Sequence, residues 1–274
     1  MKFLSEVEQS FEGKKVFVRV DFNVPLKDGV IQNNKRILAS IPTIKKLLDM
    51  NASVILASHL GRPKGAKVKE FSLEPVAYEL SKLLDTDVSF CEDCVGDELE
   101  TLCETLRPKQ ILLLENLRFY KAETENDEKF SRQLSALADI YVNDAFGTVH
   151  RAHASTCGMV SFFPLKYAGF LIEKEVKALS KIVKDYEKPF VAIIGGAKVS
   201  DKLPVLSQLL NRVDKLVIGG AMAYTFLKAK GIKIGNSMCE ENKIHNAKSL
   251  LNNAEKLGVE IILPVDHLVC DEFN

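Results

Sequence analysis

Several arginine and histidine side chains of this 274-residue chain follow short apolar segments, close to the point where each segment ends. The planar guanidinium of arginine grips a phosphate or carboxylate through two parallel hydrogen bonds, and a histidine adds another donor. Because the carboxyl ends of parallel strands meet at one edge of a sheet, these side chains should gather there and bind a small anion. They are His59, Arg62, Arg118 and Arg151, together with Arg36 at the start of the first predicted helix.

Asp21 and Asn23 follow the first apolar segment, Lys15–Val20, and add a carboxylate acceptor and an amide to the same edge. Together they suit hydroxyl groups, so a small phosphorylated hydroxy acid is a better fit than bare phosphate. Two other interpretations remain open: each arginine forms an ion pair on the surface, or His150 and His153 hold a metal from one helical turn. Three neighbours share the predicted anion site, namely Phe22, Leu60 and Gly61.

A second candidate phosphate site lies in the last third of the chain, where glycine pairs follow two apolar segments and open helices. Glycine lets backbone N–H groups approach a phosphate closely, although tight packing would also explain the pairs. Lys198 and Lys202, four residues apart, are expected on one helical face, where their like charges repel unless a polyphosphate lies between them. The glycines are Gly195, Gly196, Gly219 and Gly220.

Short apolar segments of strand length alternate with longer segments of helical periodicity. The strand-like segments are near-continuously apolar, which is typical of strands buried on both faces of a parallel sheet. The alternation predicts βαβ units and an α/β fold. Strands are predicted at 15–20, 53–57, 111–114, 140–142, 190–194, 216–218 and 259–263, and helices at 37–50, 72–84, 97–106, 128–137, 203–210 and 243–257.

The chain is expected to form two domains, because its composition changes near Phe162-Phe163-Pro164. Residues 1–168 would form the first α/β domain. A single amphipathic helix over 169–186 would connect it to a second α/β domain over 187–274. The alternative is one continuous sheet with a longer helix.

The composition is that of an ordinary folded protein, with 46% hydrophobic and 27% charged residues. The 37 basic residues balance the 37 acidic ones, which argues against a nucleic-acid partner. No apolar stretch is long enough for a membrane span, and Met1–Gln9 does not read as an export signal. The six cysteines then indicate reduced thiols and a cytoplasmic protein; a zinc site seeded by Cys91, Cys94 and Cys103 is the less favoured alternative.

Five long motifs, spread through the chain in order, resemble phosphoglycerate kinase. They are RVDFNVP (19–25), SHLGRP (58–63), LLENLRF (113–119), NDAFG with HRAH (143–153) and GGAKVSDK (195–202). The resemblance covers essentially the whole length. It implies two Rossmann-like, doubly wound parallel-sheet domains that face each other across a cleft and close about a hinge. In that family the first domain binds 3-phosphoglycerate and the second binds magnesium with ATP or ADP.

The resemblance also assigns roles to particular residues. Arg36 would lie nearest the reacting carboxylate, Lys198 would stabilise the phosphoryl group in transit, and Lys202 would contact the nucleotide phosphates. Ala221 stands where many relatives have a third glycine. The implied 3-phosphoglycerate site comprises Asp21, Phe22, Asn23, Arg36, His59, Leu60, Gly61, Arg62, Arg118 and Arg151, and the nucleotide site comprises Gly195, Gly196, Lys198, Lys202, Gly219 and Gly220.

The implied reaction is reversible phosphoryl transfer between ATP and 3-phosphoglycerate, giving ADP and 1,3-bisphosphoglycerate, by a monomeric enzyme without a membrane partner. The sequence departs from the family after 259–263, where relatives continue through the rest of the nucleotide domain. The second domain is therefore expected to be incomplete, and the family's magnesium ligand lies in the absent part. A non-catalytic 3-phosphoglycerate-binding fragment remains an alternative. A dinucleotide-dependent oxidoreductase is disfavoured, because the chain lacks a GxGxxG motif.

Overall fold

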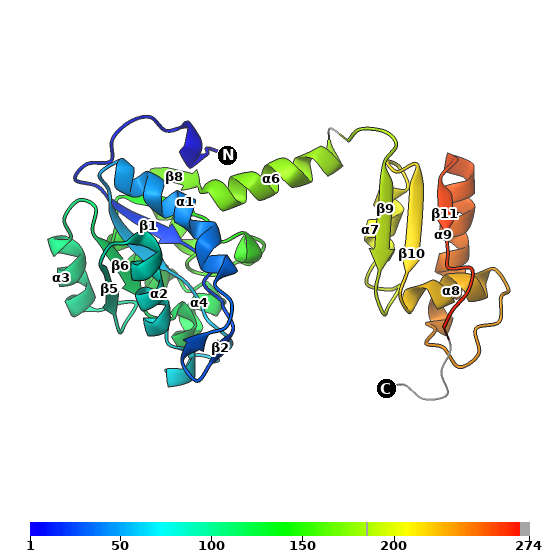
Figure 1. Cartoon of the computed structure of the whole chain (residues 1–274), viewed down its shortest axis with the longest axis horizontal. Helices are drawn as coiled ribbons and strands as arrows, with labels where there is room; N and C mark the ends of the chain where they lie inside the picture. Colours follow the sequence, from blue (N-terminus) through cyan, green and yellow to red (C-terminus); the bar gives the residue numbers. More distant parts are fainter. Residues whose placement is uncertain (185, 269–274) are drawn as a thin grey trace. The chain divides into compact units, whose positions relative to one another are not determined.

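The computed structural model describes residues 1–184 and 186–268 and divides into two compact units, Met1–Ser180 and Lys181–Asn274 (Figure 1). The dividing line falls inside a helix, α6 (Phe170–Val183), which is shorter than the segment 169–186 expected from the sequence. Asp185 of that segment and the end of the expected second domain, 269–274, lie outside the described residues. The assignment of functional domains stays a prediction, and each unit is described by itself.

Unit 1, Met1–Ser180, is built on a six-stranded, fully parallel sheet with the order β5-β6-β4-β1-β7-β8. Strands β4, β6 and β5 lie on one side of β1, and β7 and β8 lie on the other. The direction in which the chain adds strands to the sheet therefore reverses beside β1. In open α/β sheets, ligands bind outside the carboxyl ends of the strands at such a reversal. The strands are β1 (Lys15–Arg19), β4 (Ser53–Ala57), β5 (Val88–Cys91), β6 (Ile111–Leu114), β7 (Ile140–Asn143) and β8 (Leu165–Ala168).

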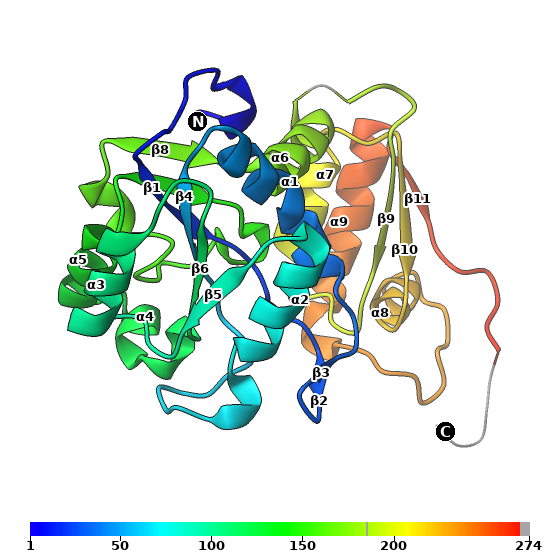
Figure 2. The same ribbon diagram turned by 60° about the vertical axis from the view of Figure 1, so that its left-hand side comes forward.

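Helices cover both faces of this sheet, which confirms the doubly wound α/β prediction (Figure 2). Alternate residues of β1 show why: Val16 and Val18 pack into one core cluster with Ile37 and Leu80, while Phe17 packs into the other with Leu134. The strands are therefore apolar on both faces, as their continuous hydrophobicity indicated. The helices of this unit are α1 (Lys35–Asp49), α2 (Glu74–Leu84), α3 (Asp97–Thr105), α4 (Lys121–Glu125), α5 (Glu128–Ala136) and most of α6.

Unit 2, Lys181–Asn274, contains a three-stranded parallel sheet with the order β11-β10-β9. Its core is a single cluster in which Leu216 and Ile218 of the central strand pack against Leu206, Phe226 and Leu250 of the helices. The elements are β9 (Val191–Gly195), β10 (Lys215–Gly219), β11 (Glu260–Ile262), α7 (Leu203–Leu209), α8 (Met222–Ala229) and α9 (Ile244–Leu257).

Some elements were not expected from the sequence, because they are short or lie at an edge and carry little periodicity. They include α4, β5, the edge strand β8 and a hairpin of β2 (Leu26–Lys27) and β3 (Val30–Ile31). None of the helices within the described residues is long and apolar enough to cross a bilayer. The 3-10 helices are η1 (Leu4–Glu6), η2 (Lys69–Phe71), η3 (Leu117–Phe119), η4 (Phe146–Thr148), η5 (Gly158–Phe162) and η6 (Glu241–Lys243).

Candidate active site

The carboxyl edge of the sheet in unit 1 brings Asp21, which follows β1, against Arg36 at the start of α1. Arg36 NH1 donates to Asp21 Oδ2 at 2.7 Å. Asn23 Oδ1 accepts a hydrogen bond from the Gly61 backbone N–H at 2.9 Å, which ties the loop after β1 to the loop after β4. Four of the residues predicted from the sequence thus meet at the edge where the winding reverses.

His59, which follows β4, is buried among cations. Burial, reinforced by Arg19, Arg118 and other arginines, lowers the pKa of His59 to about 2. Its Nδ1 lies 3.2 Å from NH2 of Arg19. The imidazole is therefore neutral at physiological pH and contributes hydrogen bonds, not charge, to this edge.

A cavity of about 400 Å³ opens between the predicted cations of unit 1. Arg118 is held in place by a 2.7 Å hydrogen bond from NH1 to the Gly61 carbonyl, and burial, together with Arg151 and Arg19, lowers its pKa to about 10. It remains a cation at neutral pH, so the cavity is positively charged and suits an anion with several oxygens. The lining residues are Arg62, Lys64, Gly65, Arg118, Thr124, Arg151 and His153.

Asn116 fixes the loops that carry these side chains. Its buried amide donates to the carbonyls of Leu60 at 2.7 Å and Phe71 at 2.9 Å. Its Oδ1 accepts from the backbone N–H groups of Leu60 and Arg118, at 3.2 and 3.0 Å. One side chain therefore sets the position of the loop after β4 and of the guanidinium after β6.

Three predicted members of the site present no side chain at the edge of the sheet. The side chains of Phe22 and Leu60 belong to the apolar core. Gly61 has φ of +61°, and a Cβ there would lie 2.4 Å from the Phe71 ring, so the loop needs glycine at this turn. The N–H groups of all three residues are already engaged within the protein, with Ser58, Asn116 and Asn23 as their acceptors.

Four contributors to this edge were missed in the sequence. Lys64 and Thr124 line the cavity, and Lys64 directly follows the SHLGRP motif. Arg19 and Glu123 are both fully buried, at 1% and 0% exposure. The available signal for a buried charge is Arg19, which follows the apolar residues Val16, Phe17 and Val18 of β1.

The alternative interpretation, in which His150 and His153 hold a metal from one helical turn, does not fit the structure. The chain from 150 to 153 forms turns and irregular structure after η4, because the short 3-10 turn does not extend into a helix. His150 is exposed, whereas His153 points toward the buried carboxylate of Glu123, with 3.8 Å between Nδ1 and Oε1. Desolvation lowers the pKa of His153.

The glycine turns of unit 2 lie against each other at the ends of β9 and β10. Gly220 has φ of +68°, and a Cβ there would lie 2.9 Å from both the N and O atoms of Gly196. The Met222 N–H, which opens α8, donates to the Gly196 carbonyl at 2.9 Å. Close approach of two backbones explains these glycines, and it places the amino end of α8 beside the turn.

The placement of Lys198 and Lys202 on one helical face is wrong. Pro204 occupies the first turn of α7, which begins only at Leu203, so Lys198 lies in the preceding loop and Lys202 is the residue before the helix. Both side chains are exposed next to the glycine turns. The Cε of Lys202 is 3.9 Å from the position of a Cβ on Gly196.

Cys91, Cys94 and Cys103 pack inside an apolar core cluster of unit 1. Burial raises the pKa of all three thiols, that of Cys103 to about 12, and Cys94 Sγ donates to the Glu115 carbonyl at 3.0 Å. Zinc binds thiolates, which such an environment disfavours. Across 1–184 and 186–268, no group of three or more His, Cys, Asp or Glu side chains is arranged to hold a metal, magnesium included.

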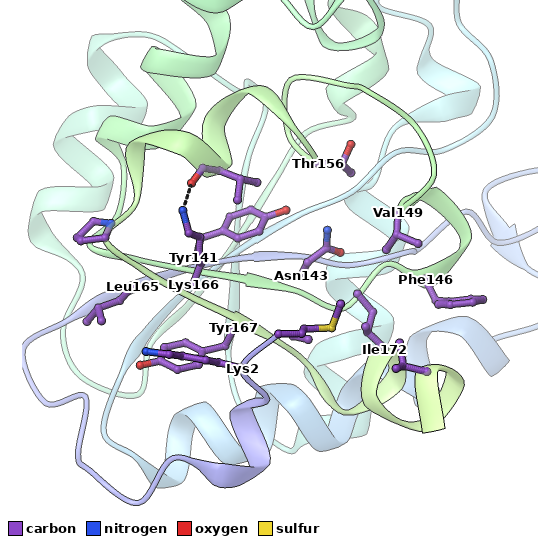
Figure 3. A pocket seen from close by; sticks show the side chains of 15 residues that line it. Lys2, Tyr141, Asn143, Phe146, Val149, Thr156, Leu165, Lys166, Tyr167 and Ile172 are labelled. Carbon is purple, nitrogen blue, oxygen red and sulfur yellow. Dashed lines mark hydrogen bonds between the residues drawn. The ribbon is translucent and has the colours of Figure 1, made fainter. Parts of the chain in front are cut away.

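A separate cavity of about 520 Å³ lies along the edge strand β8 and is mostly apolar (Figure 3). Tyr141, Phe146 and Ile172 line it, and Lys166 donates from Nζ to the Val160 carbonyl at its rim. Because no arginine lines this cavity, the cationic edge is the better candidate for binding an anion.

The comparisons with known proteins agree with the motifs. The family model for phosphoglycerate kinase matches residues 5–274. The phosphoglycerate kinase of Finegoldia magna is 53% identical over 265 residues, which are 96% of this chain and 67% of that protein. The enzyme of Moorella thermoacetica is 53% identical over 274 residues, which are 100% of this chain and 70% of that protein.

Solved structures of phosphoglycerate kinases are also similar to this chain. A phosphoglycerate kinase from Coxiella burnetii superposes with a TM-score of 0.86 at 42% identity, covering 95% of this chain and 65% of that one. That of Pyrococcus horikoshii has a TM-score of 0.74 at 35% identity, with 94% and 64% covered. The chain thus spans about two thirds of the length of these relatives. Given this agreement in motifs, sequence and fold, the chain belongs to the phosphoglycerate kinase family.

Proposed function

We propose that unit 1 binds 3-phosphoglycerate and that the chain supports reversible phosphoryl transfer between ATP and the carboxylate of that acid. The observation that carries this proposal is the cationic cavity formed by Arg62, Arg118 and Arg151. Beside it, at the same edge of the sheet, lie the Asp21–Arg36 pair and the neutral His59. A remote phosphate suits the cavity, and hydroxyl and carboxylate groups suit the polar residues at the edge.

The proposed phosphoryl transfer needs no general base. A carboxylate oxygen of 3-phosphoglycerate attacks the γ-phosphorus of ATP, and a new oxygen–phosphorus bond forms. The bond to the bridging oxygen breaks, and its electron pair leaves on ADP. Because a carboxylate is already ionised at neutral pH, the protein only has to position the reactants and neutralise charge. Arg36 is the proposed residue at the carboxylate, and Lys198 at the phosphoryl group.

The glycine turns of unit 2 are the proposed nucleotide site. Two exposed lysines, Lys198 and Lys202, lie next to Gly196 and Gly220, whose backbones approach too closely for larger side chains. Backbone N–H groups and lysines of this kind suit the phosphates of ATP or ADP. Magnesium bound with the nucleotide would supply further charge neutralisation, and the described residues offer lysines and N–H groups for the phosphates rather than a ligand set for the metal.

A second candidate function is favoured by one observation. The whole set of residues proposed for 3-phosphoglycerate lies within unit 1, which has a complete sheet with helices on both faces, whereas the chain spans 67% of its relative from Finegoldia magna. The second candidate function is therefore that of a fragment that binds 3-phosphoglycerate without phosphorylating it.

Two measurements on the chain separate these functions. Calorimetry with 3-phosphoglycerate tests binding, and a coupled assay of its ATP-dependent phosphorylation tests transfer. Turnover that falls by orders of magnitude in both Arg36→Ala and Lys198→Ala would support the kinase, since each variant removes charge stabilisation from the transferring group. Binding without turnover would support the binding fragment. Near-normal turnover in either variant would overturn the assignment of catalytic residues, and no binding at all would overturn both functions.

A further inference from the structure

A buried chain of hydrogen bonds runs from Glu123 to Arg19 through Ser155, and none of the three side chains is more than 1% exposed. Ser155 donates to Glu123 twice, from Oγ to Oε1 at 2.6 Å and from its backbone N–H to Oε2 at 2.9 Å. Arg19 Nε in turn donates to Ser155 Oγ at 2.8 Å. The carboxylate of α4 is thereby linked through one hydroxyl to the guanidinium at the end of β1.

The same guanidinium reaches His59 on its other side, where NH2 lies 3.2 Å from Nδ1. Arginine has only donors, so Nδ1 must be the acceptor of this hydrogen bond. A neutral imidazole carries one proton, which is then on Nε2. Arg19 therefore decides which ring nitrogen of His59 is left to donate to a ligand.

Arg19 needs a countercharge to remain in this position. Burial and Arg151 lower its pKa, and the attraction of Glu123 is the largest influence in the opposite direction. A buried cation without a partner is strongly destabilising. Its third nitrogen, Nη1, donates to the Val20 carbonyl. A carbonyl is uncharged and cannot balance the charge of the guanidinium.

We propose that Glu123 is a positioning residue for His59: through Ser155 and Arg19 it fixes the proton of the imidazole on Nε2, so that this N–H can donate to the acid substrate. The identity of that substrate rests on the proposed function. The state of the ring does not, because it is a property of the free protein. Glu123 is not one of the residues that line the cavity, so its role is distinct from that of the cavity arginines.

Burial and four cations from different places in the fold lower the pKa of His59. Burial is the largest of these causes and would persist if Arg19 moved, so the ring tautomer rather than the pKa reports on positioning. The four groups are Arg19 from β1, Arg36 from α1, Arg118 from η3 and Arg151 from the loop after η4.

The test is ¹⁵N NMR of the ring nitrogens in the full chain without ligand, recorded from about pH 8 to about pH 5, the range in which an ordinary histidine titrates. The His59→Asn spectrum identifies the signals of His59 among the five histidines. In the wild-type protein we expect His59 to remain neutral over this range, with an unprotonated Nδ1 and a protonated Nε2. A proton on Nδ1, or titration within the range, would overturn the proposal.

The decisive variant is Glu123→Gln, which keeps the shape of the side chain and removes its charge. We expect a population of His59 with its proton on Nδ1 to appear, because Arg19 without its countercharge no longer holds Nδ1 as an acceptor. Glu128→Gln is the matched control, since this glutamate of α5 is exposed and pairs only with Arg132 in the part of the chain that is described. It should leave His59 unchanged. A His59 that keeps its proton entirely on Nε2 in Glu123→Gln would show that Glu123 is not needed, and would overturn the proposal.

Ser155→Ala is a second variant in case Glu123→Gln does not fold. It keeps both charges but removes the hydroxyl that joins Glu123 to Arg19 Nε. We expect a smaller population with the proton on Nδ1 than in Glu123→Gln, and an unchanged tautomer would count against the chain of hydrogen bonds. Calorimetry with 3-phosphoglycerate then separates the two proposals. A correct ring state without binding would refute the proposed ligand alone, and binding with the wrong ring state would refute the positioning role alone.

Discussion

Arg36 and Asp21 form an ion pair whose two members differ in exposure, with 52% of the arginine side chain and 11% of the aspartate side chain accessible. The carboxylate is held by the sheet edge, whereas the guanidinium extends into solvent. Pairs of this kind contribute at most about 1 kcal/mol to stability. Arg36 can therefore leave Asp21 for a ligand carboxylate at little cost.

Arg36→Ala tests this relationship. A charge-assisted hydrogen bond contributes about 1.5–3 kcal/mol, so we expect 3-phosphoglycerate to bind roughly 10- to 100-fold more weakly. The free energy of unfolding should change by less than about 1 kcal/mol. Calorimetry and urea denaturation measure the two effects. Arg132→Ala, which removes another exposed arginine of unit 1, is the control and should alter neither. Undiminished binding by Arg36→Ala would contradict the proposed role.

Asn116→Ala should destabilise the protein and weaken ligand binding together. The substitution leaves the buried carbonyls of Leu60 and Phe71 without their donor and frees the loop that carries Arg118. Each unsatisfied buried group costs about 1–3 kcal/mol, so we expect a loss of about 2–4 kcal/mol in the free energy of unfolding. Asn33→Ala, which removes one exposed hydrogen bond to the Lys35 N–H, should cost less than about 1 kcal/mol. Equal effects of the two substitutions would argue against Asn116 as the organising residue.

The elements that carry the site follow from hydrophobic pattern alone. Strands such as β1 and β6 are apolar on both faces, so their positions, their parallel pairing and the polar residues at their ends could be predicted. The short edge strand β8 and the five-residue α4 could not, because neither is long enough to show a period. Glu123 was missed for that reason: it lies on α4, and its burial depends on contacts with distant residues.

The error at Lys198 and Lys202 has a different cause. A spacing of four fits one face of a helix, but Pro204 near the start of α7 places both lysines before that helix. Proline was the local signal that could have set the boundary. The packing of the Phe22 and Leu60 side chains in the core was likewise beyond the sequence, because a residue next to a predicted site gives no indication of which way its side chain points.

Gly220→Ala should destabilise unit 2, because the added Cβ would meet the Gly196 backbone at 2.9 Å and φ is +68°. Neither backbone can move without disturbing β9 or β10. We expect a loss of about 1–3 kcal/mol in the free energy of unfolding, measured by urea denaturation with circular dichroism. Gly219→Ala is the matched control, since no atom within the described residues lies within 4 Å of its Cβ position. A Gly220→Ala protein as stable as Gly219→Ala would show that the close approach of the two turns is not required.

Asp144 is a buried carboxyl at the start of α6, and its ionisation should oppose folding. Oδ1 accepts from the Leu171 N–H at 2.8 Å, while Oδ2 has no hydrogen-bond partner among the described residues. Burial raises the pKa of Asp144 to about 6, although the Thr43 hydroxyl and the Leu171 N–H act in the other direction. Between the pKa of the unfolded chain, about 4, and that of the folded protein, the folded state binds more protons. This group therefore destabilises the protein as the pH rises through that window.

Asp144→Asn removes the ionisation and keeps an oxygen that can accept from the Leu171 N–H. The free energy of unfolding of the variant minus that of the wild type should be larger at about pH 7.5 than at about pH 4, by about 2–3 kcal/mol. Urea denaturation at the two pH values measures the difference. Asp127→Asn is the control, because this exposed aspartate caps α5 through the Phe130 N–H and asparagine caps equally well, so its effect should stay small at both values. A difference for Asp144→Asn that does not change with pH would show that Asp144 folds in its ionised form, with its charge stabilised by the N–H groups of α6 rather than penalised by burial.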